Sequence, residues 1–132
     1  MKKTNNIIAA SIWIAGTFVL CYQATPIMGG LFFVPFVLGP HAVTHIGVWL
    51  AKTKKAQSIL MFALFAYAAW FGFVYTDVFY LHPDTQSPIA LLFVGVYALP
   101  VLVPLWAVAW WLDSKGRANN GFHADAHKAV RE

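Results

Sequence analysis

Two histidines, His41 and His45, lie four residues apart in the segment GPHAVTHIGVW, within a long apolar stretch of the chain. A spacing of four places both imidazoles on one face of a helix. Counting back from Lys52 at ~1.5 Å per residue puts His41 about 16 Å and His45 about 10 Å from the end of that stretch. The same count gives Tyr67, in the next apolar stretch, the height of His41. Ionisable residues at such depth usually face a bundle interior or a cavity.

Three interpretations of the histidine pair are open. The pair is structural if hydroxyl or carbonyl groups satisfy both rings; Thr17 is expected at the height of His41 and Ser11 nearer that of His45. It forms a proton relay or a polar ligand contact if Tyr67 completes a hydrogen-bonded path, because imidazole titrates near neutral pH. It binds a metal ion or haem if further ligands exist. No acid or thiol is expected at that depth, so we predict no cofactor within one subunit and keep haem or a metal shared between subunits as a minor alternative.

A second group of candidate residues follows the third apolar stretch, in the segment TDVFYLHPD. Asp77, His82 and Asp84 could together bind a cation at the outer face, or they could simply be interfacial residues in contact with water. Asp77 lies roughly 15 Å too far outward to pair with either mid-membrane histidine.

Enzymatic activity is not expected from this sequence. It shows no nucleophile with a neighbouring base, no phosphate-binding glycine loop, no pair of carboxylates and no complete set of metal ligands. We therefore assign no catalytic residue.

The elements that carry these residues are predicted to be membrane helices. Of 132 residues, 60% are hydrophobic and only 11% are charged, which is more apolar surface than a small soluble domain can bury. Four apolar segments, at about residues 6–24, 29–51, 57–81 and 88–112, are each long enough to cross a hydrocarbon layer of ~30 Å. They lack the alternation of barrel strands. We predict an all-α integral membrane protein whose residues 1–113 form four transmembrane helices in an up-down bundle.

Prolines occur within two of the predicted spans. Pro35 and Pro40 lie in the second span, and Pro100 and Pro104 lie in the fourth. Each proline removes one backbone donor and usually bends a helix, so kinks are expected in both spans.

Small residues at a spacing of four occur in the first and third spans. The pairs are Ser11 with Ala15 and Ala68 with Gly72. Such pairs let helix backbones approach closely. Packing within the bundle is the favoured interpretation, and a dedicated dimer face is the alternative.

The basic residues predict the topology. If the chain crosses four times, all nine Lys and Arg residues fall on one side, because the connections TPIM and HPDTQS contain none. The positive-inside rule then places both termini in the cytoplasm, in a bacterial inner membrane, with residues 114–132 as a mobile cytoplasmic tail. Because the basic residues flank apolar runs, the net charge of +4 indicates acidic lipid headgroups rather than nucleic acid.

The expected function is that of a small partner-binding or accessory membrane subunit, of the assembly, inhibition or immunity type. One alternative is a homo-oligomeric transporter or channel with a polar path at His41, His45 and Tyr67. Another is a redox subunit that binds haem or quinone. The predicted partners are the lipid bilayer and either a second membrane protein or further copies of the chain.

Overall fold

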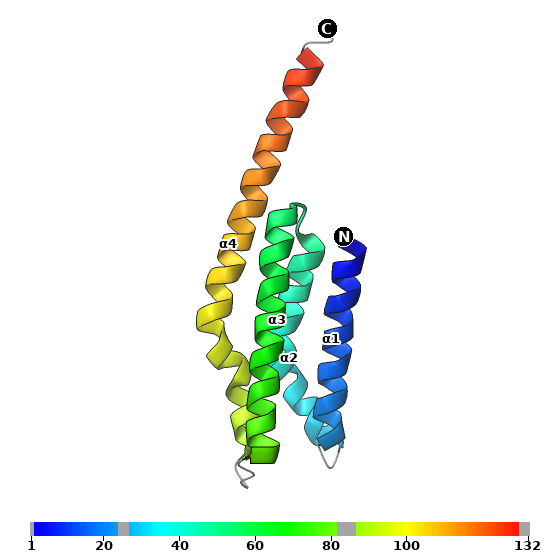
Figure 1. The fold of residues 1–132 in the computed structure, drawn as a ribbon, viewed down its shortest axis with the longest axis vertical. Helices are drawn as coiled ribbons and strands as arrows, with labels where there is room; N and C mark the ends of the chain where they lie inside the picture. Colours follow the sequence, from blue (N-terminus) through cyan, green and yellow to red (C-terminus); the bar gives the residue numbers. More distant parts are fainter. Residues whose placement is uncertain (1, 24–26, 82–86, 130–132) are drawn as a thin grey trace.

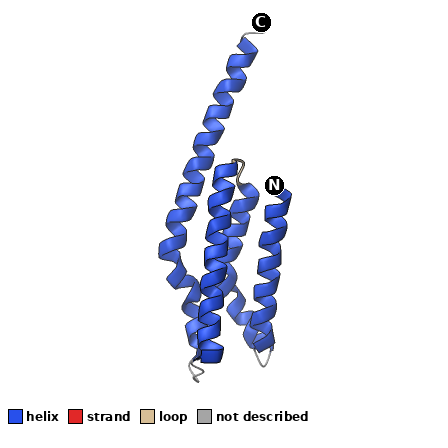
Figure 2. Ribbon diagram, viewed as in Figure 1, coloured by secondary structure: helices blue, strands red, loops and turns tan. Residues whose placement is uncertain are grey.

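The computed structural model describes residues 2–23, 27–81 and 87–129, and all the regular structure in these ranges is helical (Figure 2). Helix α1 spans Lys2–Gln23, α2 spans Ile27–Leu50, α3 spans Lys54–Thr76 and α4 spans Ser87–Ala129. A short π-helix, η1 at Asp77–Leu81, continues α3. The four α-helices of the described chain are each long and apolar enough to cross a membrane. The predicted fold class, an all-α membrane protein with four spans, is therefore confirmed.

Helix α3 begins three residues before the predicted start of its apolar stretch. Thr53 has extended backbone angles (φ −91°, ψ 143°), and its Oγ1 accepts a hydrogen bond from the backbone N–H of Ala56 at 3.4 Å. This N-cap satisfies one of the amide groups that a helix leaves unpaired at its start. The first turn of α3 is therefore polar, with Lys54 and Lys55 ahead of the apolar part.

Helices α2, α3 and α4 pack against one another, whereas α1 packs mainly on α2, touches α3 only slightly and lies at the edge of the bundle (Figure 1). Only 17% of the residues in the most apolar part of α1 are buried, against 28 to 33% in the other three helices. The N-terminus and the α2–α3 connection lie at the same end of the bundle, and α4 extends well beyond that end. One side of α1 is thus left without a neighbouring helix.

The largest fully buried side chains are Tyr67, Leu64, Leu102 and His41, contributed by α2, α3 and α4. Around Tyr67 the buried apolar residues form one cluster that joins these three helices to Leu20 of α1. Lipid is as apolar as these side chains, so tight packing and hydrogen bonds between helices must hold the cluster together.

The predicted small-residue pair of α1, Ser11 and Ala15, does not pack within the bundle. Ser11 and Ala15 are both exposed. Helix α1 instead meets α2 through Ala9, Gly16 and Leu20, and a Cβ atom at Gly16 would lie 3.1 Å from Leu38. The expectation of bundle packing for Ser11 and Ala15 is therefore wrong, because another stripe of α1 fits α2 more closely.

Helices α2 and α4 approach closely at a proline of α2. Pro40 has no N–H to offer the carbonyl of Phe36, one turn earlier. Gly95 of α4 lies against this carbonyl, and a Cβ atom there would be 2.3 Å from the Phe36 oxygen and 3.2 Å from Pro40 Cγ. No side chain fits at position 95 without separating the two helices.

Both proline-containing spans are assigned as uninterrupted helices. Pro35 and Pro40 lie inside α2, and Pro100 and Pro104 lie inside α4; the kinks expected at them stay a prediction. Helix α4 continues to Ala129, through most of the segment assigned to the cytoplasmic tail, and the mobility of that tail also stays a prediction.

Candidate functional site

His41 connects the second helix to the first. Its side chain is only 1% exposed, and its Nε2 atom lies 3.3 Å from the carbonyl oxygen of Ala9 on α1. Since a carbonyl oxygen can only accept, the ring donates this hydrogen bond and carries its proton on Nε2. The imidazole is thus held by the backbone of a neighbouring helix.

Tyr67 connects the third helix to the second in a similar way. Its hydroxyl donates to the carbonyl oxygen of Val37, one turn before His41 on α2. The ring centroids of Tyr67 and His41 are 6.4 Å apart, so the structure brings together the two residues expected at one height. Their polar atoms bond to separate carbonyl groups, and no hydrogen bond joins the two described side chains.

Thr44 and Trp106 link the second helix to the fourth. Trp106 Nε1 donates to Thr44 Oγ1 at 3.0 Å, and Thr44 donates in turn to the carbonyl oxygen of Pro40 at 2.8 Å. Trp70 Nε1 of α3 similarly lies 3.3 Å from the carbonyl oxygen of Val94 on α4. Neither Thr44 nor Trp106 was singled out in the sequence. The spacing from Pro40 to Thr44 is the signal that could have drawn attention to Thr44, because Thr often bonds to the carbonyl four residues earlier.

The other mid-membrane candidates are not joined to His41. His45 is half-buried and forms no hydrogen bond with another described residue. Thr17 donates to Trp13 on its own helix at 3.0 Å, and Ser11 is exposed. The expected height of Thr17 is wrong: it lies about 12 Å further along α1 than Ala9, the residue that meets His41. The predicted height was counted from the lysines at the start of the helix. It was wrong because the packing of α1 on α2 determines the register of α1.

The outer candidates are only partly described. Asp77 begins η1 and is half-buried, whereas His82 and Asp84 lie outside the described residues. Within residues 2–23, 27–81 and 87–129, no three His, Cys, Asp or Glu side chains gather closely enough to hold a metal ion. A cation site at Asp77, His82 and Asp84 stays a prediction, as does a haem or metal ion shared between subunits.

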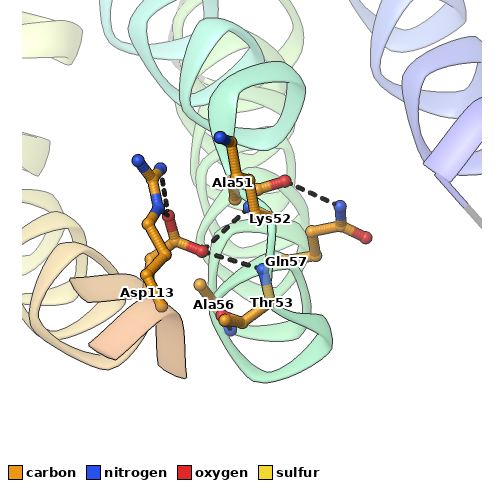
Figure 3. Close-up of polar contacts among 7 residues, drawn as sticks. Ala51, Lys52, Thr53, Ala56, Gln57 and Asp113 are labelled. Atoms are coloured by element: carbon orange, nitrogen blue, oxygen red, sulfur yellow. Dashed lines mark hydrogen bonds and ion pairs between the residues drawn. The ribbon is translucent and has the colours of Figure 1, made fainter. Parts of the chain in front are cut away.

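Asp113 forms a polar site that sequence reasoning missed (Figure 3). Its carboxylate lies between α4 and the α2–α3 connection, where Oδ1 accepts hydrogen bonds from the backbone N–H groups of Lys52 and Thr53, each at 2.8 Å. Oδ2 accepts from Arg117 Nε at 2.9 Å and also from Arg117 Nη2. The residue is only 6% exposed. Both oxygens are therefore fully used, which is what burial of a carboxylate requires.

The same connection is held by two further contacts. Gln57 Nε2 donates to the carbonyl oxygen of Ala51 at 3.0 Å, and Gln57 is itself buried (Figure 3). Gly116 lies so close to Thr53 that a Cβ atom at this glycine would be 2.4 Å from Thr53 Cγ2. The predicted boundary at Asp113 thus falls inside a packed contact between α4 and the α2–α3 connection.

Exposed basic residues lie at the same end of the bundle as this network. We call this end of the molecule the basic end of the bundle. It is defined by six exposed basic residues: Lys3, Lys52, Lys54, Lys55, Lys115 and Arg117. Lys115 Nζ lies 3.9 Å from the centre of the Trp111 ring, a cation–π distance.

The fold and these contacts define a multi-pass helical membrane protein whose interhelical polar contacts mostly end on backbone groups. Comparison of the chain with protein-family models, with curated proteins and with solved structures found no match.

Proposed function

We propose that the protein is a non-enzymatic accessory subunit that binds another membrane protein through the open side of α1. The observation that carries the proposal is a row of four large apolar side chains, each 64 to 76% exposed, on one face of this helix: Ile7, Ile14, Phe18 and Tyr22. The exposed small residues Ser11 and Ala15 lie within that row. We call the six residues together the α1 face.

The composition of the α1 face favours a helix as its binding partner. Small residues allow a second helix to approach closely, and the large side chains on either side add contact area. The peripheral position of α1, which leaves one side of the helix without a neighbouring helix, makes it the most accessible of the four helices for a partner.

The polar contacts inside the bundle support the same assignment. His41, Tyr67, Thr44 and Trp106 are hydrogen-bonded partners of neighbouring helices, a role that stabilises packing and needs no substrate. The bundle is then a scaffold that presents α1.

The orientation is part of the proposal. The α2–α3 connection and the segment of α4 after Asp113 carry exposed Lys and Arg residues, which the positive-inside rule places in the cytoplasm. We propose a bacterial inner membrane and cytoplasmic termini. Protease accessibility of a C-terminal tag in inverted and right-side-out vesicles tests this orientation.

The complex itself is tested by a blue-native gel and crosslinking at native expression. We expect the chain to migrate with a different membrane protein, identified by mass spectrometry. Ala15→Trp should release that protein because the new ring blocks the α1 face. The matched control Ala69→Trp, at an exposed alanine of α3, should not. A lone homo-oligomer in both variants and in the unmodified chain would refute the proposal.

One observation favours a polar path as the second candidate function. Asn6 Oδ1 is buried without a hydrogen-bond partner, one turn from Ala9 toward the basic end. His45 lies one turn from His41 in the same direction. Unpaired polar atoms are costly in hydrocarbon, so water or a polar substrate would stabilise both. Proteoliposome flux that is lost in His41→Ala and His45→Ala would support a transporter or channel, and unchanged flux would exclude the pair from its path.

A further inference from the structure

A groove of about 470 Å³ lies between α2 and α4 at the basic end, with one wall contributed by α3. Its volume falls within the range of about 300–1,000 Å³ typical of small-molecule sites. The lining is apolar along the helices, at Val43, Leu50, Trp106 and Trp110, and polar where α4 passes the α2–α3 connection, at Asp113 and Arg117.

The two parts of the groove follow the order of residues along α4. Trp106 and Trp110 line the part farther from the polar segment after Asp113, together with Val43 and Leu50 of α2. Ser114 and Arg117 follow one and two turns later, at the basic end. A molecule that fills this groove therefore needs an apolar chain and a polar group at one end.

The charge of the polar group is indicated by Arg117. A guanidinium has five N–H donors, and Asp113 uses only Nε and one Nη2 donor. The Arg117 side chain is 51% exposed, while that of Asp113 is 8% exposed. Asp113 and Arg117 balance each other's charge, but the other three N–H donors of Arg117 are not used by Asp113, and their planar arrangement suits a phosphate.

The surroundings of the groove have the same sign of charge. Lys52, Lys54 and Lys115 are exposed at this end, and the nearest carboxylate in the described chain is the paired Asp113. Basic pockets between membrane helices are a common way to bind anionic lipid headgroups.

We propose that this groove binds an anionic phospholipid, with an acyl chain between Trp106 and Leu50 and the phosphate group at Arg117. The α1 face is not part of the groove, so this site does not depend on the proposed accessory function. The lipid would hold α2 and α4 together at the point where Asp113 already joins them.

Native mass spectrometry of the full chain with phosphatidylglycerol or phosphatidylcholine tests the site. We expect phosphatidylglycerol to bind at least about tenfold more tightly. Val43→Trp should reduce that binding about tenfold because the indole fills the groove, from a position that is 51% exposed. Val103→Trp, at a valine of α4 that is 52% exposed and does not line the groove, is the matched control and should bind as the unmodified chain does.

Two further variants keep the test decisive. Leu50→Trp fills the groove from a second exposed position, in case Val43→Trp does not fold. Arg117→Lys retains the charge but loses the planar pair of donors, and it should lower the preference for phosphatidylglycerol severalfold. Equal binding of the two lipids, or unchanged binding in both groove-filling variants, would overturn the proposal. A change in oligomer mass with unchanged lipid binding would assign the groove to a second copy instead.

Discussion

At mid-bundle, His41 and Tyr67 each bond to one carbonyl of a neighbouring helix, whereas at the basic end Asp113 alone bonds two amides and an arginine. The carbonyl groups at mid-bundle belong to helical residues, which have backbone partners of their own. The amides of Lys52 and Thr53 lie between α2 and α3, where no helical partner is available. Loss of the Asp113 carboxylate is therefore expected to cost more stability than loss of the hydrogen bond made by either His41 or Tyr67.

The largest effect is expected where α2 and α4 touch at Gly95, because no space for a side chain exists there. Gly95→Ala places a Cβ atom 2.3 Å from the Phe36 carbonyl and should destabilise the protein by about 3 kcal/mol or more. Gly72→Ala is the matched control, because nothing lies within 4 Å of its Cβ position, and it should be neutral or stabilising. Unfolding in detergent micelles measures both. Equal stability of the two variants would contradict the packing at Gly95.

Removal of the carboxylate at the basic end should have the next largest effect. Asp113→Ala leaves two amides and Arg117 without their partner, at an expected cost of about 3 kcal/mol. Asp113→Asn retains one oxygen for the amides of Lys52 and Thr53 and should cost clearly less. Unfolding midpoints of both variants check this order. If Asp113→Ala lost less stability than Tyr67→Phe, the mid-bundle bond would be the more important of the two, contrary to this account.

Mid-bundle bonds should be weaker. Tyr67→Phe removes only the hydrogen bond to Val37 and should cost about 1 kcal/mol, because the ring continues to fill its buried position. The same unfolding measurement applies. A loss of about 3 kcal/mol would mean that the mid-bundle bond contributes as much stability as the Asp113 carboxylate at the basic end.

The smallest interaction energy is expected between α2 and α4 at Thr44 and Trp106. A double-mutant cycle with Thr44→Val and Trp106→Phe should give a coupling of about 0.6 kcal/mol, the average for hydrogen bonds between membrane helices. The cycle isolates the Nε1 to Oγ1 bond from the packing of the indole. No measurable coupling would mean that this contact adds packing alone.

The parts of the fold that leave a pattern in the sequence were predictable. Long apolar runs identify four spans without reference to tertiary structure, and the height of Tyr67 follows from its distance to Lys55. The height of Thr17 was predicted wrongly because no residue near it indicates the register at which α1 packs on α2. That register depends on Ala9 and Gly16, and small residues of similar appearance occur elsewhere on the same helix.

The polar site at the basic end was harder to predict because most of its partners are backbone groups. The partners in Lys52 and Thr53 are backbone N–H groups, which no residue type indicates. Asp113 was therefore interpreted as the start of a polar tail. The spacing of four between Asp113 and Arg117 was the available signal. The contact of Gly95 with a carbonyl freed by Pro40 likewise depends on tertiary structure, because either residue alone is ordinary in a membrane helix.

A photocrosslinking scan in native membranes tests the central claim, that α1 presents a partner-binding face, most directly. A benzoyl-phenylalanine probe at Ile14 or Phe18, both exposed, should form adducts with one membrane protein other than this chain. The same probe at Trp13, which faces the bundle, or at Phe62, exposed on α3, should not. Equal adducts from Phe18 and Phe62, or adducts only with further copies of the chain, would contradict the proposed function.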